Sequence, residues 1–230
     1  MARFIRLDTE IAMNAKGKVR LLIADDHRLV AEAFAKMLQE EFQVVGVVTD
    51  GRSLVRAALE LKPNVVIVDV SMSQLNGLDA AEQIKRKLPS IKVIFLTMNT
   101  DPVFAAEAFR RGASGYVLKH SGAQEFLDAV RKVNEGQSYL SPLIASDTMS
   151  YLLHDPKSRG ERQITRRQSE ILQLLAEGRA MKDIADILDI SPGTVAFHKY
   201  NMMEKLGITS NAGLLLYALK HNMTPVQHFA

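Results

Sequence analysis

The sequence predicts an α/β doubly wound domain with a five-stranded parallel sheet, followed by a small all-α domain. Before residue 135, short apolar runs alternate with helical patterns five times. These runs contain few polar residues, as expected for parallel strands that are buried on both faces. After residue 163 the pattern is purely helical. The change of pattern favours two domains over one large one.

Five strands and five helices are expected in the first domain. Strands that alternate with helices imply right-handed crossovers and a sheet covered on both faces. The expected strands are Val19–Ala24, Phe42–Val48, Val65–Asp69, Ile91–Leu96 and Gly115–Leu118. The expected helices are His27–Glu40, Ser53–Leu61, Leu78–Lys87, Pro102–Arg111 and Ala123–Asn134.

The chain after this domain begins with residues 135–163, which contain several Gly, Ser and Pro residues and predict a linker with room for one helix. The helices expected after the linker are Thr165–Glu177, Met181–Leu188, Ser191–Leu206 and Asn211–His221. The predicted segments are therefore an extension at 1–18, the α/β domain at 19–134, the linker at 135–163, the helical domain at 164–222 and a tail at 223–230.

Composition limits the classes of function. Apolar residues make up 47% of the chain, which is enough for two cores, and no apolar run is long enough to cross a bilayer. Residues 1–18 lack the continuous apolar stretch of a secretory signal. The absence of cysteine excludes disulfides and thiolate metal sites. We therefore expect a soluble, cytoplasmic protein without a membrane partner.

The net charge of +3 is concentrated in the second domain. Residues 157–222 contain ten Lys or Arg against seven Asp or Glu, and the remainder of the chain is neutral. A mildly basic module is compatible with nucleic-acid binding, although this excess alone does not establish it.

Polar residues follow four of the predicted strands directly. Asp25 and Asp26 follow the first strand, Asp69 ends the third, and Thr97 and Lys119 follow the fourth and fifth. The carboxyl ends of parallel strands converge on the crevice where α/β sheets bind ligands. Three carboxylates with one lysine and one hydroxyl indicate a site for a divalent cation and a phosphoryl group.

The chemistry assigns a role to each of these residues. Asp25 and Asp26 would hold Mg²⁺, which prefers oxygen ligands. Asp69 would accept the phosphoryl group, Lys119 would neutralise its charge, and Thr97 would donate its hydroxyl to a phosphoryl oxygen. The structural alternative is that the acids merely begin a helix and that Lys119 is a solvated charge. The coincidence of these residues at successive strand ends favours the site.

These residues resemble the receiver domain of two-component response regulators over about 115 residues. The resemblance rests on the segments 24–27, 68–72, 76–77, 96–97 and 115–119. It implies a flavodoxin-like fold and identifies Asp69 as the phosphoacceptor. It further implies that Asp25, Asp26, Asp69 and the Ser71 carbonyl bind Mg²⁺, and that Thr97 and Tyr116 form a coupled switch pair. Tyr116 has the alternative of being an ordinary packed aromatic residue.

Three residues depart from the family pattern. Ser73 replaces the usual Pro, which loosens the loop after the acceptor. Met98 stands where a small residue is usual and is bulky enough to crowd the phosphoryl pocket. His120 replaces a common Pro. None of these changes removes a group that phosphoryl transfer needs, so we expect a working site with unusual rates.

The helical domain contains a pattern typical of a helix-turn-helix. Ser191 is a good N-cap, Pro192 suits the first helical position, and Gly207 suits the C-cap. The helix that begins at Pro192 would be the one that enters the major groove. A helical bundle used for protein contacts is the alternative reading of this pattern.

The order and spacing of residues 164–207 resemble the LuxR/NarL-type DNA-binding domain over about 60 residues. This resemblance implies that the helix from Pro192 to Leu206 reads bases and that the last helix supports dimerisation. Helical spacing predicts that Val195, Met202 and Leu206 face the core. The predicted DNA-contacting residues are Lys182, Thr194, Val195, Ala196, Phe197, Lys199, Tyr200 and Asn201.

Departures from this second pattern weaken the expected contacts. Ala196 replaces a frequent Lys, which removes one phosphate or base-edge contact. Ala196 and Phe197 could instead contact thymine methyl groups, and Asn201 could read adenine. Phe197 has the alternative of only packing within the domain. Lys182, Lys199, Arg166, Arg167 and Arg179 are the predicted phosphate contacts.

Together these features predict a DNA-binding transcriptional response regulator rather than an enzyme. Its expected partners are a sensor histidine kinase or a small phosphodonor, which supplies the phosphoryl group, and double-stranded promoter DNA. The expected assembly is a homodimer. Three alternatives remain at this point. One is a regulator whose DNA binding does not depend on phosphorylation. Another is a metal-dependent phosphatase or phosphotransferase, although Ser71 stands where such enzymes commonly carry an acid. The last is a protein-interaction module that has lost DNA binding.

Overall fold

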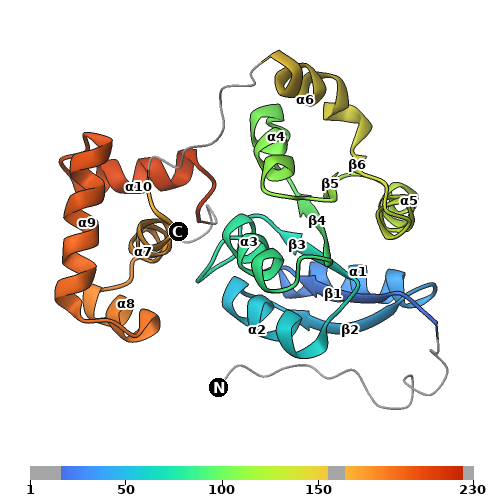
Figure 1. Ribbon diagram of the computed structural model, residues 1–230, viewed down its shortest axis with the longest axis horizontal. Coiled ribbons are helices and arrows are strands. Elements are labelled where there is room, and N and C mark those ends of the chain that lie inside the picture. Colours follow the sequence, from blue (N-terminus) through green and yellow to red (C-terminus); the bar gives the residue numbers. More distant parts are fainter. Residues whose placement is uncertain (1–16, 155–163, 225–230) are drawn as a thin grey trace.

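The computed structural model describes residues 17–154 and 164–224. Its N-terminal domain is built on an open sheet of parallel strands in the order β2-β1-β3-β4-β5-β6 (Figure 1). The predicted doubly wound α/β fold is confirmed, but the sheet has six strands instead of five. The strands are β1 (Arg20–Ala24), β2 (Gln43–Val48), β3 (Val65–Asp69), β4 (Lys92–Thr97), β5 (Gly115–Leu118) and β6 (Tyr139–Leu140).

Helices cover both faces of this sheet. Helices α1 and α5 pack on one face, and α2, α3 and α4 pack on the other. Every predicted strand and helix of this domain is present, and the ends differ from the predicted ones by at most two residues. The helices are α1 (Arg28–Gln39), α2 (Gly51–Leu61), α3 (Gly77–Lys87), α4 (Pro102–Arg110) and α5 (Ala123–Asn134).

Strand β3 shows how the core fixes the position of the acidic residues. All of its residues are buried. Val66 and Val68 pack toward α2 and α3, whereas Val65 and Ile67 pack toward α1 and α5. Burial of each such aliphatic side chain stabilises the fold by about 1.5–3 kcal/mol. Asp69 therefore ends a strand that is held firmly on both sides.

Part of the predicted linker is packed against the first domain. Strand β6 pairs in parallel with β5, and helix α6 (Pro142–His154) packs against α4 (Figure 1). Ser141 anchors this segment, because its hydroxyl accepts from Leu118 N at 3.1 Å and donates to Glu125 Oε1 at 2.5 Å. The helix that the sequence allowed within this segment is therefore present as α6, and the strand before it was not expected. Strand β6 contains only Tyr139 and Leu140, and two residues are too few for a strand pattern to be recognised in the sequence. Residues 155–163 lie outside the described residues.

The C-terminal domain consists of helices, as predicted. They are α7 (Arg166–Ala176), α8 (Met181–Leu188), α9 (Pro192–Leu206) and α10 (Asn211–Lys220). The predicted caps of α9 are confirmed: the Ser191 side chain accepts from Thr194 N, Pro192 occupies the first turn, and Gly207 adopts a left-handed conformation with φ of 66°. The short turn between α8 and α9 gives the predicted helix-turn-helix. Across the described ranges, no helix combines the length and apolarity that a bilayer crossing requires.

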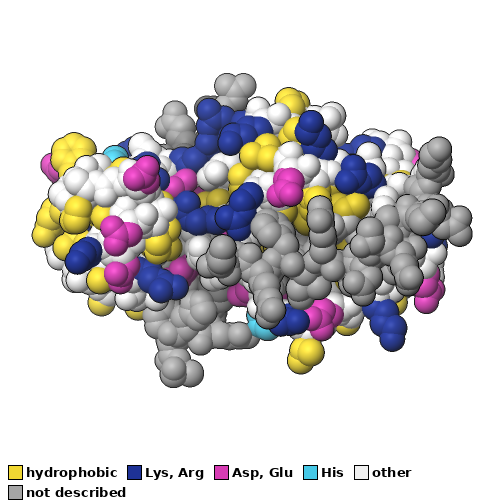
Figure 2. All heavy atoms as spheres, turned by 90° about the horizontal axis from the view of Figure 1, so that it is seen from below, with side chains coloured by type: hydrophobic (Ala, Val, Ile, Leu, Met, Phe, Trp, Pro, Cys, Tyr) yellow, Lys and Arg dark blue, Asp and Glu magenta, His cyan; other side chains and the backbone are white. Residues whose placement is uncertain are grey.

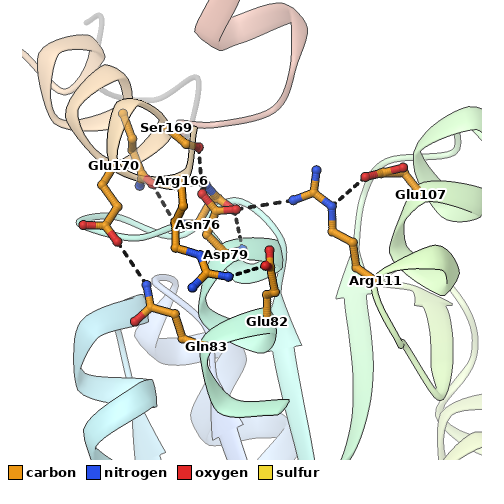
Figure 3. A network of polar contacts seen from close by, with 10 residues as sticks. Asn76, Asp79, Glu82, Gln83, Glu107, Arg111, Arg166, Ser169 and Glu170 are labelled. Carbon is orange, nitrogen blue, oxygen red and sulfur yellow. Dashed lines mark hydrogen bonds and ion pairs between the residues drawn. The ribbon is translucent and has the colours of Figure 1, made fainter. Parts of the chain in front are cut away.

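Helix α7 joins the two domains through a polar face. Arg166 forms an ion pair with Glu82 of α3, and the Ser169 hydroxyl donates to Asp79 Oδ2 at 2.7 Å (Figure 3). Glu170 accepts from Gln83 Nε2 at 3.1 Å. Helix α9 lies on the opposite side of the C-terminal domain, away from the sheet (Figure 1). The domains therefore touch through α7 and not through the predicted reading helix.

Candidate functional site

The predicted acidic residues come together at the carboxyl edge of the sheet. Strands β1 and β3 are neighbours with Ala24 opposite Val68, so Asp25 and Asp69 leave adjacent strands at the same level. Ligand atoms of Asp25, Asp26, His27 and Asp69 all lie within 4.8 Å of one another. His27 was not predicted as part of this site; its Nδ1 lies 2.8 Å from Asp26 Oδ1.

Lys119 bridges two of these carboxylates. Its Nζ lies 2.7 Å from Asp25 Oδ2 and 2.8 Å from Asp69 Oδ2. The main-chain N–H of Lys119 also donates to Thr97 O at 2.8 Å, which fixes the end of β5 against the end of β4. Thr97 is buried beside it. The alternative of a solvated Lys119 is therefore wrong, because this side chain is only 11% exposed and paired.

The electrostatics show a site that is short of positive charge. Burial raises the pKa of the Asp69 carboxyl; Lys119 opposes the rise and Asp25 adds to it. Burial also raises the pKa of Asp26, where His27 opposes the rise. Burial lowers the pKa of Lys119, but Asp69 and Asp25 together raise it by more. One lysine thus faces three carboxylates in a poorly solvated place.

This donor set fits a divalent cation. Carboxylate oxygens are the ligands that Mg²⁺ prefers, and a second positive charge would offset the burial cost that raises the pKa values of Asp26 and Asp69. Of the predicted metal ligands, Asp25, Asp26 and Asp69 lie close enough together to share such an ion.

The loop after β3 returns close to the end of that strand. A Cβ atom on Gly77 would lie 2.1 Å from Asp69 O, so only glycine fits where α3 begins. Asn76 caps this helix by accepting from Asp79 N at 2.9 Å. The Ser73 carbonyl accepts from Leu75 N and from Gly51 N. These hydrogen bonds order the loop although Ser73 stands where Pro is usual.

The predicted switch residues are linked through a residue that sequence reasoning missed. Asn99 N donates to Thr97 Oγ1 at 3.0 Å, and the Tyr116 hydroxyl donates to Asn99 O at 2.9 Å. Tyr116 is fully buried, and this burial raises the pKa of its phenol. Asn99 carries no distinguishing signal in the sequence, because it acts through its main chain.

Met98 does not fill the site. Its side chain is 65% exposed, so it lies largely in solvent although it directly follows Thr97. The expected crowding of the phosphoryl pocket by this residue is not seen in the structure. His120 also lies at the surface, as an exposed residue of the turn after β5.

Helix α9 presents an exposed aromatic surface. Phe197 and Tyr200 are each 61% exposed, which excludes the alternative that Phe197 only packs within its own domain. Asn201 is exposed, and Thr194, Ala196 and Lys199 are partly exposed on the same helix. Lys182 is exposed on α8.

The prediction that Val195 contacts DNA is not supported by its position in the structure. Its side chain is fully buried against Ile184 and Leu188, so it positions α9 on α8 and cannot reach a base. Its spacing with Met202, which is also buried, already indicated the core side of the helix.

The arginines of α7 are engaged within the protein. Arg166 pairs with Glu82, and Arg167 donates to Glu170 Oε2 at 3.0 Å and to Leu188 O at 2.7 Å. Arg166 is therefore engaged by the receiver and Arg167 by its own domain, so neither side chain is placed for the predicted phosphate contact. On the face shown in Figure 2, Lys and Arg side chains are interspersed with Asp and Glu.

Comparisons with known proteins agree with both parts of this description. Residues 21–131 match the response regulator receiver domain, and residues 162–218 match the bacterial regulatory proteins of the luxR family. The response regulator GacA of Pseudomonas aeruginosa is 35% identical over 209 residues, which cover 89% of this chain and 97% of that protein.

Solved structures of RcsB show the same arrangement of domains in sequence. RcsB from Salmonella enterica serovar Typhimurium, bound to the promoter P1flhDC with the phosphomimetic BeF₃⁻, matches with a TM-score of 0.58 and 30% identity, over 87% of this chain and 98% of that one. A structure of two RcsB dimers bound to two parallel DNAs matches with a TM-score of 0.56 and 27% identity, over 88% and 98% of the two chains. These matches exclude the phosphatase alternative. The chain belongs to the two-component response regulators that join a receiver domain to a LuxR-family DNA-binding domain, and it is a DNA-binding transcriptional regulator.

Proposed function

We propose that Asp69 is the phosphoacceptor of this regulator. An Asp69 carboxylate oxygen attacks the phosphorus of the donor while the bond from phosphorus to the donor breaks, and the donor leaves with the electron pair of that bond. The product is an acyl phosphate on Asp69. The observation that supports this proposal is the bridge formed by Lys119 between Asp69 and Asp25, because a largely buried cation beside Asp69 would offset the charge of a phosphoryl group there.

Magnesium is the cofactor that the donor set fits. When bound by Asp25, Asp26, Asp69 and the Ser71 carbonyl, Mg²⁺ would supply the positive charge that neutralises phosphoryl oxygens. The raised pKa values of Asp26 and Asp69 imply that protons compete for these ligands as the pH falls. Lys119 holds the carboxylates in place before the ion arrives.

The switch runs from Thr97 through Asn99 to Tyr116. A phosphoryl group on Asp69 would offer an acceptor to the Thr97 hydroxyl proton, and a turn of the Thr97 side chain toward it would change the hydrogen bond that Thr97 Oγ1 accepts from Asn99 N. Movement of Asn99 would change the carbonyl to which the buried Tyr116 hydroxyl donates. The pair then biases a receiver with two states.

The DNA contact belongs to α9. Exposed Phe197 and partly exposed Ala196 fit thymine methyl groups, and exposed Asn201 fits the edge of adenine. Lys199 of α9 and Lys182 of α8 fit phosphates. This surface is less basic than a lysine at position 196 would make it, so we expect binding that depends more on apolar contact and less on salt.

The partners follow from the family and the site. A sensor histidine kinase or a small phosphodonor would supply the phosphoryl group, and double-stranded promoter DNA would be the target. RcsB forms dimers on DNA, and a homodimer of this chain would require two half-sites with matching symmetry.

The alternative is a regulator that binds DNA whether or not Asp69 is phosphorylated. The exposed position of α9 favours it, because the receiver does not cover the reading helix (Figure 1). Under this alternative, a phosphodonor would leave DNA binding unchanged.

Retention of DNA from a random genomic pool separates the two functions. Wild type and Asp69→Ala would be compared at low and moderate salt in the presence of Mg²⁺, with and without a phosphodonor. Phosphodonor-dependent retention that is lost in Asp69→Ala supports the proposal. Equal retention in all conditions supports the phosphorylation-independent regulator, and no retention at all contradicts DNA binding by α9.

A further inference from the structure

The loop that carries the metal-binding carbonyl is held by the C-terminal domain. Gln173 of α7 donates from Nε2 to Met72 O at 2.8 Å and accepts from Asn76 N at 2.7 Å. Glu177 accepts from Gln74 N at 2.8 Å. The two side chains thus hold three main-chain groups within the seven residues that follow Asp69.

These hydrogen bonds lie on both sides of a strained turn. Gln74 has a φ of 64°, in the left-handed region that costs a non-glycine residue about 1 kcal/mol or more. Asn76 Nδ2 also donates to Gln173 Oε1 at 3.3 Å. Gln173 is fully buried, so water does not reach its amide group. If this side chain were removed, Met72 O and Asn76 N would each be left without a hydrogen-bond partner.

The arrangement bears directly on Ser71. The carbonyls on either side of it are engaged: Val70 O accepts from Gly77 N at 2.8 Å, and Met72 O accepts from Gln173. Within the described ranges, no hydrogen bond to Ser71 O is formed. Gln173 therefore fixes the peptide next to Ser71 O, which is the carbonyl that stays open between the engaged carbonyls of Val70 and Met72.

We propose that Gln173 and Glu177 of the DNA-binding domain are positioning residues for the receiver's Mg²⁺ site. By holding the loop from Met72 to Asn76, they order the Ser71 carbonyl before the ion binds. This inference rests on the proposed function, because it assumes that Mg²⁺ binds at Asp25, Asp26 and Asp69. Linkage makes the effect reciprocal, so Mg²⁺ strengthens the contact of α7 with the loop by the same factor.

The spacing along α7 separates this role from general docking. Arg166, Ser169 and Glu170 bind α3 and α2 at the first turns of the helix, whereas Gln173 and Glu177 reach the loop. Arg166→Gln therefore weakens the domain contact without touching the loop and serves as the matched control. Glu177→Gln keeps an acceptor for Gln74 N and serves as the conservative variant.

The test measures the Mg²⁺ affinity of the full chain by isothermal titration with MgCl₂. Loss of these buried hydrogen bonds in Gln173→Leu is expected to raise the Kd roughly three- to tenfold. Glu177→Leu should raise it in the same direction, while Glu177→Gln and Arg166→Gln should stay near wild type. Hydrogen exchange of the Gln74 and Asn76 amides should become faster in Gln173→Leu, with the protein otherwise folded.

A second readout uses the Mg²⁺ dependence of phosphorylation by a small acyl phosphate. Gln173→Leu should need more Mg²⁺ for half-maximal rate and should recover the wild-type rate at saturating Mg²⁺. A Kd for Gln173→Leu and Glu177→Leu equal to that of wild type overturns this inference alone. Failure of the wild type to bind Mg²⁺ overturns the proposed function and this inference with it.

Discussion

Replacement of Lys119 by methionine tests whether the acidic site is short of positive charge. The Lys119 Nζ atom is the buried cation nearest to Asp25 and Asp69, whose side chains are 2% and 7% exposed. Removal of one partner from such a buried set costs about 3–5 kcal/mol. A carboxylate left without its partner limits this loss by binding a proton. Each unit by which its pKa rises corresponds to about 1.4 kcal/mol of difference between the charged and the neutral form.

The sign of the pH dependence follows from the raised pKa of Asp69. Without Lys119, the pKa of this carboxyl in the folded protein rises further above that in the unfolded chain. Between the two pKa values the folded state binds more protons, so stability falls as the pH rises. Lys119→Met should therefore lose more unfolding free energy near about pH 8 than near about pH 5.

Urea unfolding followed by circular dichroism measures this loss at both pH values. Addition of Mg²⁺, or the second substitution Asp69→Asn, should restore part of the stability at the higher pH. Lys36→Met, at an exposed position of α1, is the matched control and should change stability by less than about 0.5 kcal/mol. An equal loss at both pH values, or a larger loss at the lower one, would refute the reasoning.

Four further substitutions test other parts of the description. Gly77→Ala places a Cβ against Asp69 O, so unfolding experiments should show a loss of about 3 kcal/mol, and a variant as stable as wild type would contradict the close approach. Ser141→Ala removes the acceptor of Leu118 N and should destabilise the receiver by about 1–3 kcal/mol; unchanged thermal unfolding would argue against the anchor. Phe197→Ala should weaken DNA binding with an unchanged salt slope, whereas Lys199→Ala should reduce the slope; equal effects on the slope, measured by titration at several salt concentrations, would contradict these roles.

The acidic site could be predicted because its residues lie at the ends of the strands, which are the most regular part of the fold. Apolar parallel strands place whatever follows them at one edge of the sheet, so Asp25, Asp69 and Lys119 were expected together and are found together. Asn99 could not be predicted, because its contribution comes from main-chain groups that any residue carries.

The polar face of α7 was beyond prediction for a different reason. Ser169, Glu170 and Gln173 have the composition of a solvated helix surface, yet all are buried by the receiver. A sequence pattern distinguishes apolar from polar faces but does not reveal that one polar face meets another. Val195 was predictable from the same periodicity, which indicated the core side that the structure confirms.

The packing of α6 on the receiver shortens the tether between the domains. Only nine residues separate His154 from Ile164, and a fully extended chain of this length spans at most about 35 Å. A short tether keeps two attached domains at an effective concentration in the millimolar range. The contact between α7 and the receiver can therefore be too weak to hold two separate molecules together and still persist within one chain. For the same reason, a partner that binds either of the two surfaces can displace it easily.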